Sequence, residues 1–408
     1  MSAAGHRTWQ PDVAQLTSAL VQIPSVGSEH GERELCRYLE RFLRELPGAA
    51  VELHEWRPGR TNLICTLDSG RPGLTLLLNG HTDTVAAGSS GWTRPPFGGV
   101  IENGAVWGRG ACDMKGGLAA LAIATRELAL GGGPRAGKLV LAATADEDGE
   151  AYWGLPQLVR AGLITADAAI VAEPAGLEED FEALFLGSLG YGYAVVEVTV
   201  GNVGHSSEYD PSRPHAVAVA AALLGRIERG FRPSPVTHAL YPNGPNVVAG
   251  ELFTGGTRAG DLPREARFTV GARLLPGARR EDYTRELEKF VQGEAVGVTI
   301  RVEEEPLPGG FVDTWAPGMD IPPDHALVVA ARRWLAQAGY RAEPMGFPAF
   351  SEGAVLAAHG IPTLPALGPG QLRRYAHRPD ERVNVRALDD AVALYLDLFD
   401  RFLTGGSA

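Results

Sequence analysis

The amino-acid sequence predicts an α/β protein with a mixed, mostly parallel β-sheet covered by helices, and with a second, α+β module inserted into that domain. Three observations predict this class. Short apolar strands alternate with helical segments as far as Ala172, which is typical of a parallel sheet covered on both faces. Alternating, β-rich segments begin at Tyr191, and the earlier pattern returns at Asp324.

Length and composition limit the class of protein. The 408 residues suggest two or more domains, and a content of 45% hydrophobic and 21% charged residues fits a soluble globular chain. The formal charge is −12 and no Lys/Arg cluster occurs, which argues against a nucleic-acid partner. No run of about 18 apolar residues is present to span a membrane. The odd set of Cys36, Cys65 and Cys112, without framework spacing, and an N-terminus without a signal-peptide core lead us to expect the cytoplasm.

The first part of the chain leads to a His-x-Asp pair at the end of a strand. Amphipathic helices are expected at 11–23 and 32–46, and strands at 51–54, 62–67 and 74–78. His81 and Asp83 follow the last of these strands, and ligands bind beyond the carboxyl ends of strands in open α/β sheets. We therefore expect His81 to be a metal ligand that Asp83 holds in place, with a satisfied polar pair as the alternative.

A glycine-rich stretch at 106–117 places Asp113 just before a helix expected at 118–130. The glycines permit a tight backbone path there. Because short polar side chains are common helix caps, a cap and a metal ligand are both open for Asp113.

Acidic residues follow two further strands. A strand at 138–145 delivers Asp146, Glu147 and Asp148, and a strand at 168–172 delivers Glu173. An ordinary acidic loop is the usual explanation of such a run. Carboxylates crowded at the carboxyl ends of neighbouring strands, however, repel one another unless a cation neutralises them.

The β-rich middle of the chain predicts a separate module. Strands are expected at 191–200, 247–253, 267–275 and 298–303, and helices at 211–228 and 279–291. Their order, β-α-β-β-α-β, fits a ferredoxin-like fold. We therefore predict a catalytic domain in two parts, 1–187 and 305–408, with an inserted domain at 188–304. In the last part, we expect helices at 324–338, 351–359 and 387–402, a strand at 362–366, and a turn at 368–370.

Five stretches, in this order along nearly the whole chain, closely resemble the M20 metallopeptidase family of deacetylases, desuccinylases, aminoacylases and carboxypeptidases. They are Gly80-His81-Thr82-Asp83-Thr84-Val85, the glycine-rich stretch 108–117, Asp146-Glu147-Asp148, Glu173-Pro174 and Ala376-His377-Arg378-Pro379-Asp380-Glu381.

This resemblance implies a co-catalytic site with two Zn²⁺ ions per subunit, for which Co²⁺ is a substitute. His81 and Glu173 would hold one metal, Asp148 and His377 the other, and Asp113 would bridge both. Imidazole and carboxylate ligands suit zinc. Asp83 would orient His81, and Glu147 would be the general base for a metal-bound hydroxide.

In the inserted module, the resemblance implies a lid that also forms a homodimer. His205 would reach the partner subunit's site and stabilise the oxyanion, although without the family it is an ordinary surface histidine. Arg273 would bind a substrate carboxylate, with a strand-end salt bridge as the alternative. Gly368 and Gly370 would lie near the substrate or form an ordinary turn.

Three departures from the family pattern affect these expectations. Asp148 stands where the family usually has Glu, and its shorter side chain would displace or weaken the second metal. Gly260 stands where many members have an Asn that contacts substrate, and Ala86 replaces a Pro with minor consequence.

The expected function is a zinc-dependent amidohydrolase that removes an acyl group from an N-acyl amino acid. Segments 273–277 and 350–354 resemble acetylornithine deacetylase most closely. Succinyl-diaminopimelate desuccinylase, a broad aminoacylase and a small-peptide carboxypeptidase acting on dipeptides remain alternatives. A non-catalytic metal-binding dimer module is a rival from another class, but a degenerate site would be expected to lose Glu147.

Overall fold

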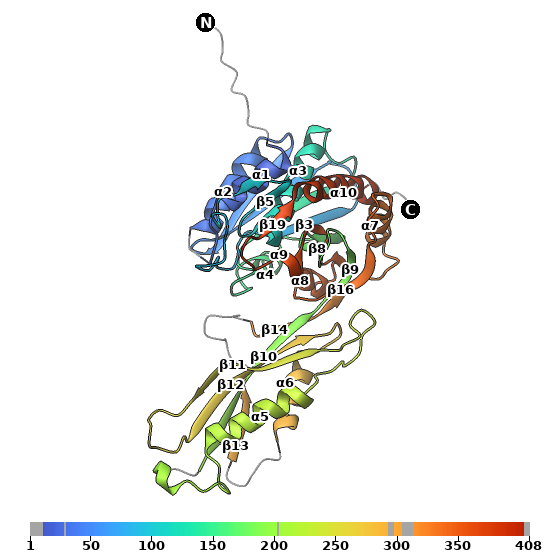
Figure 1. The fold of residues 1–408 in the computed structure, drawn as a ribbon. Helices are drawn as coiled ribbons and strands as arrows, with labels where there is room; N and C mark the ends of the chain where they lie inside the picture. The colour runs from blue at the N-terminus through green and yellow to red at the C-terminus, as the bar shows by residue number, and fades with distance from the viewer. Residues whose placement is uncertain (1–10, 28–29, 202–203, 293–297, 304–312, 404–408) are drawn as a thin grey trace. The chain divides into compact units, whose positions relative to one another are not determined.

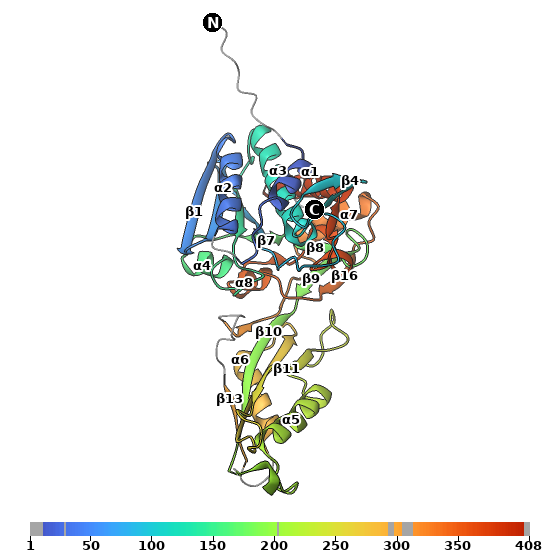
Figure 2. The same cartoon turned by 60° about the vertical axis from the view of Figure 1, so that its left-hand side comes forward.

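The computed structural model describes residues 11–27, 30–201, 204–292, 298–303 and 313–403 (Figures 1 and 2). The chain divides into two compact units. Unit 1 comprises Met1–Phe185, Ile321–Pro344 and Gly360–Ala408, and unit 2 comprises Leu186–Asp320 and Met345–His359. The expected domain boundaries stay predictions, and the one at 304/305 lies outside the described residues.

The central sheet of unit 1 has six strands in the order β1-β2-β6-β3-β7-β17. Strands β6, β3, β7 and β17 run parallel, whereas β1 and β2 join antiparallel at one edge. Leu76, Leu77 and Leu78 in β3 are fully buried, as expected for a strand covered on both faces. The predicted mixed, mostly parallel sheet is thus confirmed. Its strands are β1 (Ala49–Arg57), β2 (Arg60–Asp68), β6 (Lys138–Thr144), β3 (Thr75–His81), β7 (Ala168–Val171) and β17 (Thr363–Leu364).

Helices pack on this sheet through their apolar sides. Helix α2 (Gly31–Arg44) lies on β1 and β2 and buries Leu35, Leu39 and Leu43 at helical spacing. Helix α3 (Gly116–Leu130) lies on β3 and β6 and also contacts α1 and α10, so most of its Ala-rich surface is buried. The other helices of unit 1 are α1 (Val13–Val21), α4 (Leu155–Arg160), α7 (Ala326–Gln337), α9 (Leu372–Tyr375) and α10 (Val385–Leu403).

The carboxyl ends of three parallel strands meet at one end of the sheet. His81, the last residue of β3, pairs with Thr144, the last residue of β6. The backbone N–H of Ala172, just after β7, donates to the carbonyl of Asn79 at 3.0 Å. The segments that follow β6 and β7 therefore start beside His81.

Two small sheets complete the surroundings of this end. Strands β4 (Val100–Glu102), β5 (Ala105–Trp107) and β19 (Arg382–Asn384) form one, and β8 (Pro174–Gly176) pairs in parallel with β18 (Gly368–Gln371) in the other. The expected turn at 368–370 is wrong, because these residues form strand β18. A Cβ at Gly368 would lie 2.0 Å from the carbonyl oxygen of Ala172, so this glycine permits close strand packing rather than a turn.

Unit 2 contains an antiparallel sheet in the order β11-β12-β10-β13, with β14 (Trp315–Ala316) paired to β10. The predicted β-α-β-β-α-β order is confirmed. Helix α5 begins at Ala216 rather than at 211, because Pro214 would interrupt a helix and the His215 side chain caps the N–H of Ala218. The elements are β10 (Gly190–Val200), α5 (Ala216–Gly230), β11 (Asn246–Gly255), β12 (Glu265–Leu274), α6 (Arg280–Val291) and β13 (Val298–Glu303).

The remaining elements are short. Strands β15 (Met319–Asp320), β9 (Ala183–Ser188) and β16 (Glu343–Phe347) form a three-stranded sheet. The remaining short helical segments are η1 (Ala111–Lys115), η2 (Ser206–Glu208) and α8 (Gly353–Ala358). Among the described residues, no helix combines the length and the apolar content that crossing a membrane requires.

Candidate metal centre

Five residues expected as metal ligands come together at the carboxyl end of the unit 1 sheet. His81 is the last residue of β3, Asp148 follows β6, and Glu173 follows β7. Asp113 lies in η1 and His377 lies just after α9. Strand ends bring His81, Asp148 and Glu173 together, as their positions in the sequence predict, whereas Asp113 and His377 reach the same place from helical segments.

Asp113 lies between the two imidazoles. Its Oδ1 is 3.2 Å from Nε2 of His81, and its Oδ2 is 3.3 Å from Nε2 of His377. Helix α3 has Lys115 at its N-cap position and no side-chain cap bond, so Asp113 does not cap it. The two carboxylate oxygens thus face two separate imidazoles, which is the arrangement that a bridging ligand needs.

Each imidazole also faces a second carboxylate. Nε2 of His81 lies 3.6 Å from Oε1 of Glu173, and Nε2 of His377 lies 3.4 Å from Oδ1 of Asp148. The donor atoms of Glu147, Asp148 and His81 also lie within 4.8 Å of one another. Oδ2 of Asp148 is buried and has no hydrogen-bond partner among the described residues.

Asp83 contacts His81 mainly through its backbone. Nδ1 of His81 lies 3.0 Å from the main-chain oxygen of Asp83 and 3.5 Å from its carboxylate. The carboxylate accepts the backbone N–H groups of Glu147 and Asp148 at 3.1 and 2.9 Å. Asp83 therefore connects the histidine to the acidic loop, a second role that the sequence does not suggest.

The electrostatics of the cluster favour a bound cation. Burial and the charge of Asp113 raise the pKa of Glu173 well above its ordinary value, and burial raises the pKa of Asp148. Hydrogen bonds with Asp113 and Asp148 raise the pKa of His377 to about 11. Without a metal, protons must offset the crowded carboxylates, and a divalent cation offsets the same charge.

The spacing of the donor atoms fits zinc. Donors placed about 2.1 Å from a tetrahedral ion lie about 3.4 Å from one another. The four nitrogen–oxygen distances at His81 and His377 are 3.2, 3.3, 3.4 and 3.6 Å. The distances match the separation of two ligands of one ion, although the 3.2 Å contact of His81 with Asp113 is also a hydrogen bond.

A buried ion pair supports the centre, and the sequence alone assigned it no role. Glu381 is fully buried and pairs with Arg109, whose exposed fraction is 2%. Oε1 of Glu381 also accepts the backbone N–H groups of Cys112 and Asp113 at 3.0 and 3.1 Å. The pair therefore connects the loop of Asp113 to the segment that carries His377. The only sequence signal was that each residue stands in one of the recognised stretches.

The two expected glycines lie beside the centre. The backbone N–H of Gly368 donates to the carbonyl of Glu173 at 2.7 Å. A Cβ at Gly370 would lie 2.8 Å from Sγ of Cys112, next to Asp113. Both positions need glycine for packing, and contact with substrate stays a prediction for them.

His205 and Arg273 lie in unit 2 and are not part of this cluster of unit 1 side chains. Nδ1 of His205 accepts the backbone N–H of Ser207 at 3.2 Å, and its Nε2 lies 3.8 Å from the place of a Cβ at Gly260. Arg273 lies in β12, opposite Tyr191 of β10. Their roles toward substrate stay predictions.

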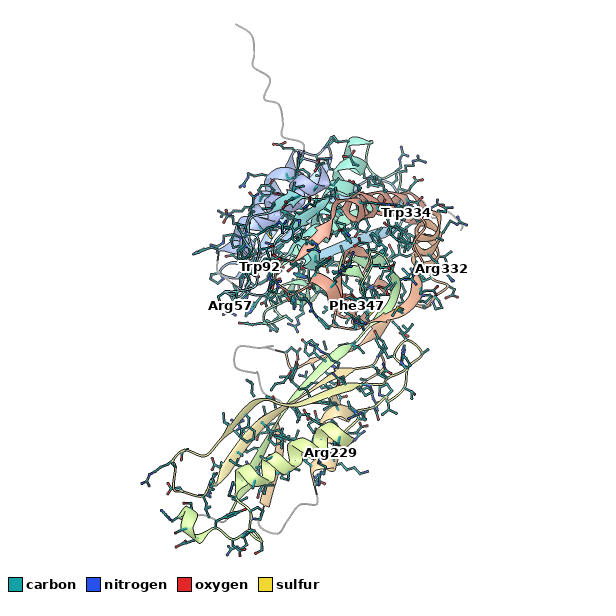
Figure 3. The ribbon with its side chains drawn as sticks, viewed as in Figure 1. Arg57, Trp92, Arg229, Arg332, Trp334 and Phe347 are labelled. Atoms are coloured by element: carbon teal, nitrogen blue, oxygen red, sulfur yellow. The ribbon has the colours of Figure 1, made fainter. Side chains whose placement is uncertain are left out.

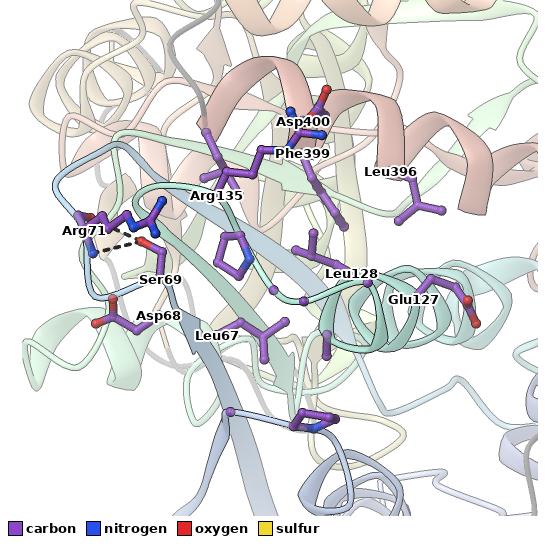
Figure 4. Close-up of a pocket in the computed structure, with 18 residues that line it drawn as sticks. Leu67, Asp68, Ser69, Arg71, Glu127, Leu128, Arg135, Leu396, Phe399 and Asp400 are labelled. Atoms are coloured by element: carbon purple, nitrogen blue, oxygen red, sulfur yellow. Dashed lines mark hydrogen bonds and ion pairs between the residues drawn. The ribbon is translucent and has the colours of Figure 1, made fainter.

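Unit 1 also has a groove of about 780 Å³ whose lining shares no residue with the centre (Figure 4). Its lining mixes apolar and charged side chains. The lining includes Leu67, Leu128, Leu396, Phe399, Arg71 and Arg135.

Comparison with known proteins agrees with this geometry. Residues 77–401 match the family described as Peptidase family M20/M25/M40. The chain is 30% identical over 390 residues to a succinyl-diaminopimelate desuccinylase of Cereibacter sphaeroides, covering 94% of this chain and 97% of that protein. It is 28% identical over 401 residues to a desuccinylase of the same name from Xanthomonas campestris, covering 96% and 99%.

The fold is also that of solved structures. A M20 family metallo-carboxypeptidase from Sulfolobus solfataricus matches with a TM-score of 0.73 at 19% identity, covering 97% of this chain and 100% of that chain. A tripeptidase from Staphylococcus aureus matches with a TM-score of 0.72 at 19% identity, covering 96% and 98%. The chain therefore belongs to Peptidase family M20/M25/M40, and it is a metal-dependent hydrolase that acts on amide bonds.

Proposed function

We propose that this protein is a two-zinc amidohydrolase that removes an acyl group from an N-acyl amino acid. The observation that carries the proposal is the position of Asp113, whose two oxygens face His81 and His377 at 3.2 and 3.3 Å. A carboxylate so placed suits a bridge between two ions. Glu173 would complete the first metal site, and Asp148 would complete the second.

The chemistry needs an activated water and a proton carrier. Zinc ions held by His81, Asp113, Asp148, Glu173 and His377 would supply Lewis-acid polarisation of the amide carbonyl and would lower the pKa of water from about 15.7 to roughly 7. Glu147 would accept a proton from the attacking water as its oxygen bonds to the carbonyl carbon. Glu147 would then return that proton to the amine nitrogen as the C–N bond breaks. The backbone N–H of Glu147 is held by Asp83 at 3.1 Å, which supports a fixed position for this base.

Two substrates are the first candidates. The resemblance of segments 273–277 and 350–354 to acetylornithine deacetylase favours N-acetyl-L-ornithine. The desuccinylase names of relatives that match 94% or more of the chain favour N-succinyl-diaminopimelate as a second candidate. A succinyl group adds a carboxylate that an acetyl group lacks, so a cationic donor such as Arg273 or another Arg would decide between the two acyl groups.

A substrate panel tests the proposal. Amine release is measured from N-acetyl, N-succinyl and N-formyl amino acids and from dipeptides, with Zn²⁺ or Co²⁺ added, and Glu147→Gln is run in parallel. We expect release from at least one N-acyl amino acid and loss of that release on chelation. A wild-type protein that binds two zinc ions but hydrolyses no member of the panel contradicts the proposal.

We further propose a homodimer formed through unit 2, in which His205 acts on the partner subunit's substrate. Sedimentation tests this proposal, since an active protein that is strictly monomeric overturns it. We also propose a cytoplasmic location, which the three buried, unpaired cysteines support.

A further inference from the structure

A buried ion network lies behind the acidic loop at the end of β6. It contains Glu32 of α2, Arg60 of β2 and Asp146, with exposed fractions of 0%, 8% and 0%. Arg60 bonds Glu32 through Nη1 at 2.5 Å and Asp146 through Nη2 at 3.0 Å. The backbone N–H of Asp146 donates to the same carboxylate oxygen of Glu32 at 3.2 Å. Three elements far apart in sequence are thereby joined at the base of the loop.

The Asp146 side chain folds the loop around itself. Its Oδ1 accepts the N–H of Glu150 at 2.8 Å, and its Oδ2 accepts those of Tyr152 and Trp153 at 3.2 and 3.1 Å. The residue has a left-handed backbone with φ of 68°, and its own carbonyl accepts the N–H of Ala151 at 2.8 Å. These contacts join Asp146 to the residues that follow Glu147 and Asp148 in the loop.

The far side of the loop is tied to the edge of the sheet. Arg57 bonds Glu150 at 2.6 Å, and the side chain of Asn62 donates to the carbonyl of Trp153 at 3.0 Å; Arg57 is labelled in Figure 3. Glu147 and Asp148 are held from the other direction, because their N–H groups donate to Asp83. The two residues thus lie between two anchors.

Gly149 shows how tightly the loop closes on this network. A Cβ there would lie 2.4 Å from Oδ1 of Asp146 and 3.1 Å from Nη2 of Arg60. The φ of Gly149 is not in the left-handed region, so the backbone itself accepts another residue. Position 149 needs glycine because the ion pair of Asp146 and Arg60 lies against the backbone there.

We propose that Arg60 and Asp146 are positioning residues, which hold the loop so that Glu147 and Asp148 both face the metal centre. This inference rests on the proposed function. Buried ion networks contribute little net stability, because desolvation offsets their attraction, so their geometric effect is the better account of this one. Neither residue touches a proposed metal site. Both act through the backbone that carries the base and a ligand of the second metal.

The most direct test is Gly149→Ala, which displaces the carboxylate of Asp146 without removing any polar group. The matched control is Gly201→Ala, at a glycine of ordinary φ where a Cβ meets nothing within 4 Å. Co²⁺ titration followed by visible absorption, kcat, KM and thermal unfolding are measured for both variants and for wild type. We expect Gly149→Ala to weaken one of the two metals and to lower kcat about 10–100-fold, with little change in KM, while the control matches wild type.

A second variant, Asp146→Asn, keeps the size of the side chain but replaces one acceptor oxygen with a donor. It decides the question if Gly149→Ala does not fold, and the same losses are expected. If a folded variant keeps wild-type metal binding and kcat, the positioning role is overturned. If both variants fail to fold, the network is purely structural, and the positioning role is overturned as well. A wild-type protein that neither binds Co²⁺ nor hydrolyses an amide overturns the proposed function instead.

Discussion

The carboxylate of Asp83 accepts the backbone N–H of Asp148 at 2.9 Å, and its other oxygen accepts that of Glu147 at 3.1 Å. The main-chain oxygen of the same residue lies 3.0 Å from Nδ1 of His81. One residue thus fixes a histidine on β3 and two acids after β6. The two sides of the proposed zinc site therefore depend on a common support.

Asp83→Asn tests this support. The variant presents an N–H₂ group to one of the two backbone N–H donors, so the loop of Asp148 loses a hydrogen bond. We expect a folded protein whose metal affinity or kcat falls about 10–100-fold. Metal titration and initial rates measure the change. Asp68→Asn, which alters an exposed carboxylate that accepts the N–H of Gly70 at 2.8 Å, should leave both unchanged. Equal losses in the two variants would contradict the special role of Asp83.

Glu147→Gln separates proton transfer from metal binding. The amide keeps the shape of the side chain but cannot accept a proton from water. We expect kcat to fall about 10²–10⁴-fold while the bound metal, measured by elemental analysis, stays at the wild-type level. Glu127→Gln, at an exposed position, serves as the control. Loss of a metal from Glu147→Gln would mean that Glu147 is a ligand rather than the base.

Glu381→Gln tests the buried pair with Arg109. The change leaves a buried guanidinium facing a neutral partner. Removal of one member of such a pair costs about 3–5 kcal/mol of folding free energy, and urea unfolding measures it. Glu102→Gln breaks an exposed pair with Arg94, and surface pairs contribute only about 0–1 kcal/mol. If both variants unfold at the same urea concentration, the pair does not hold the two loops.

The ion pair of Glu55 and Arg33 gives a pH dependence of stability away from the metal centre. Hydrogen bonds from Arg33 and Thr61 lower the pKa of Glu55 from 4.5 to about 2. The pKa of Glu55 is lower in the folded state than in the unfolded state. The contribution of this ion pair to the free energy of unfolding is therefore complete above pH 4.5 and is lost as the pH falls toward 2. The difference in unfolding free energy between wild type and Glu55→Gln should shrink from pH 6 to pH 3. A difference that stays constant over this range would show that the carboxylate is not responsible.

Three of the five proposed ligands could be found from the sequence because they follow strands, whereas His377 was identified only from the resemblance to the M20 family. His81, Asp148 and Glu173 each stand after an apolar run, and parallel strands bring their carboxyl ends together. The repeat of strand and helix, and the change to a β-α-β-β-α-β order, likewise predicted both sheets. Asp113 was ambiguous, because a polar residue before a helix is a common cap.

Other features depend on contacts that no local pattern records. Arg109 and Glu381 are 272 residues apart in sequence, and each looks like a surface charge until the fold buries it. Arg60 and Asp146 are joined in the same way. Gly368-Pro369-Gly370 has the composition of a turn, but it is a strand because it pairs in parallel with strand β8. Sequence periodicity thus finds elements and strand ends, whereas tertiary packing decides the supporting network.

The most direct test of the central claim is the metal content of wild type and His81→Ala, measured together with amide hydrolysis in the same samples. We expect two zinc ions per chain in wild type, and a loss of both metal and activity in the variant. His359→Ala is the control, since His359 is exposed and its Nδ1 lies 2.8 Å from the carbonyl of Val355 in the preceding helix. If His81→Ala keeps the wild-type metal content, His81 is not a ligand, and the proposed centre is contradicted.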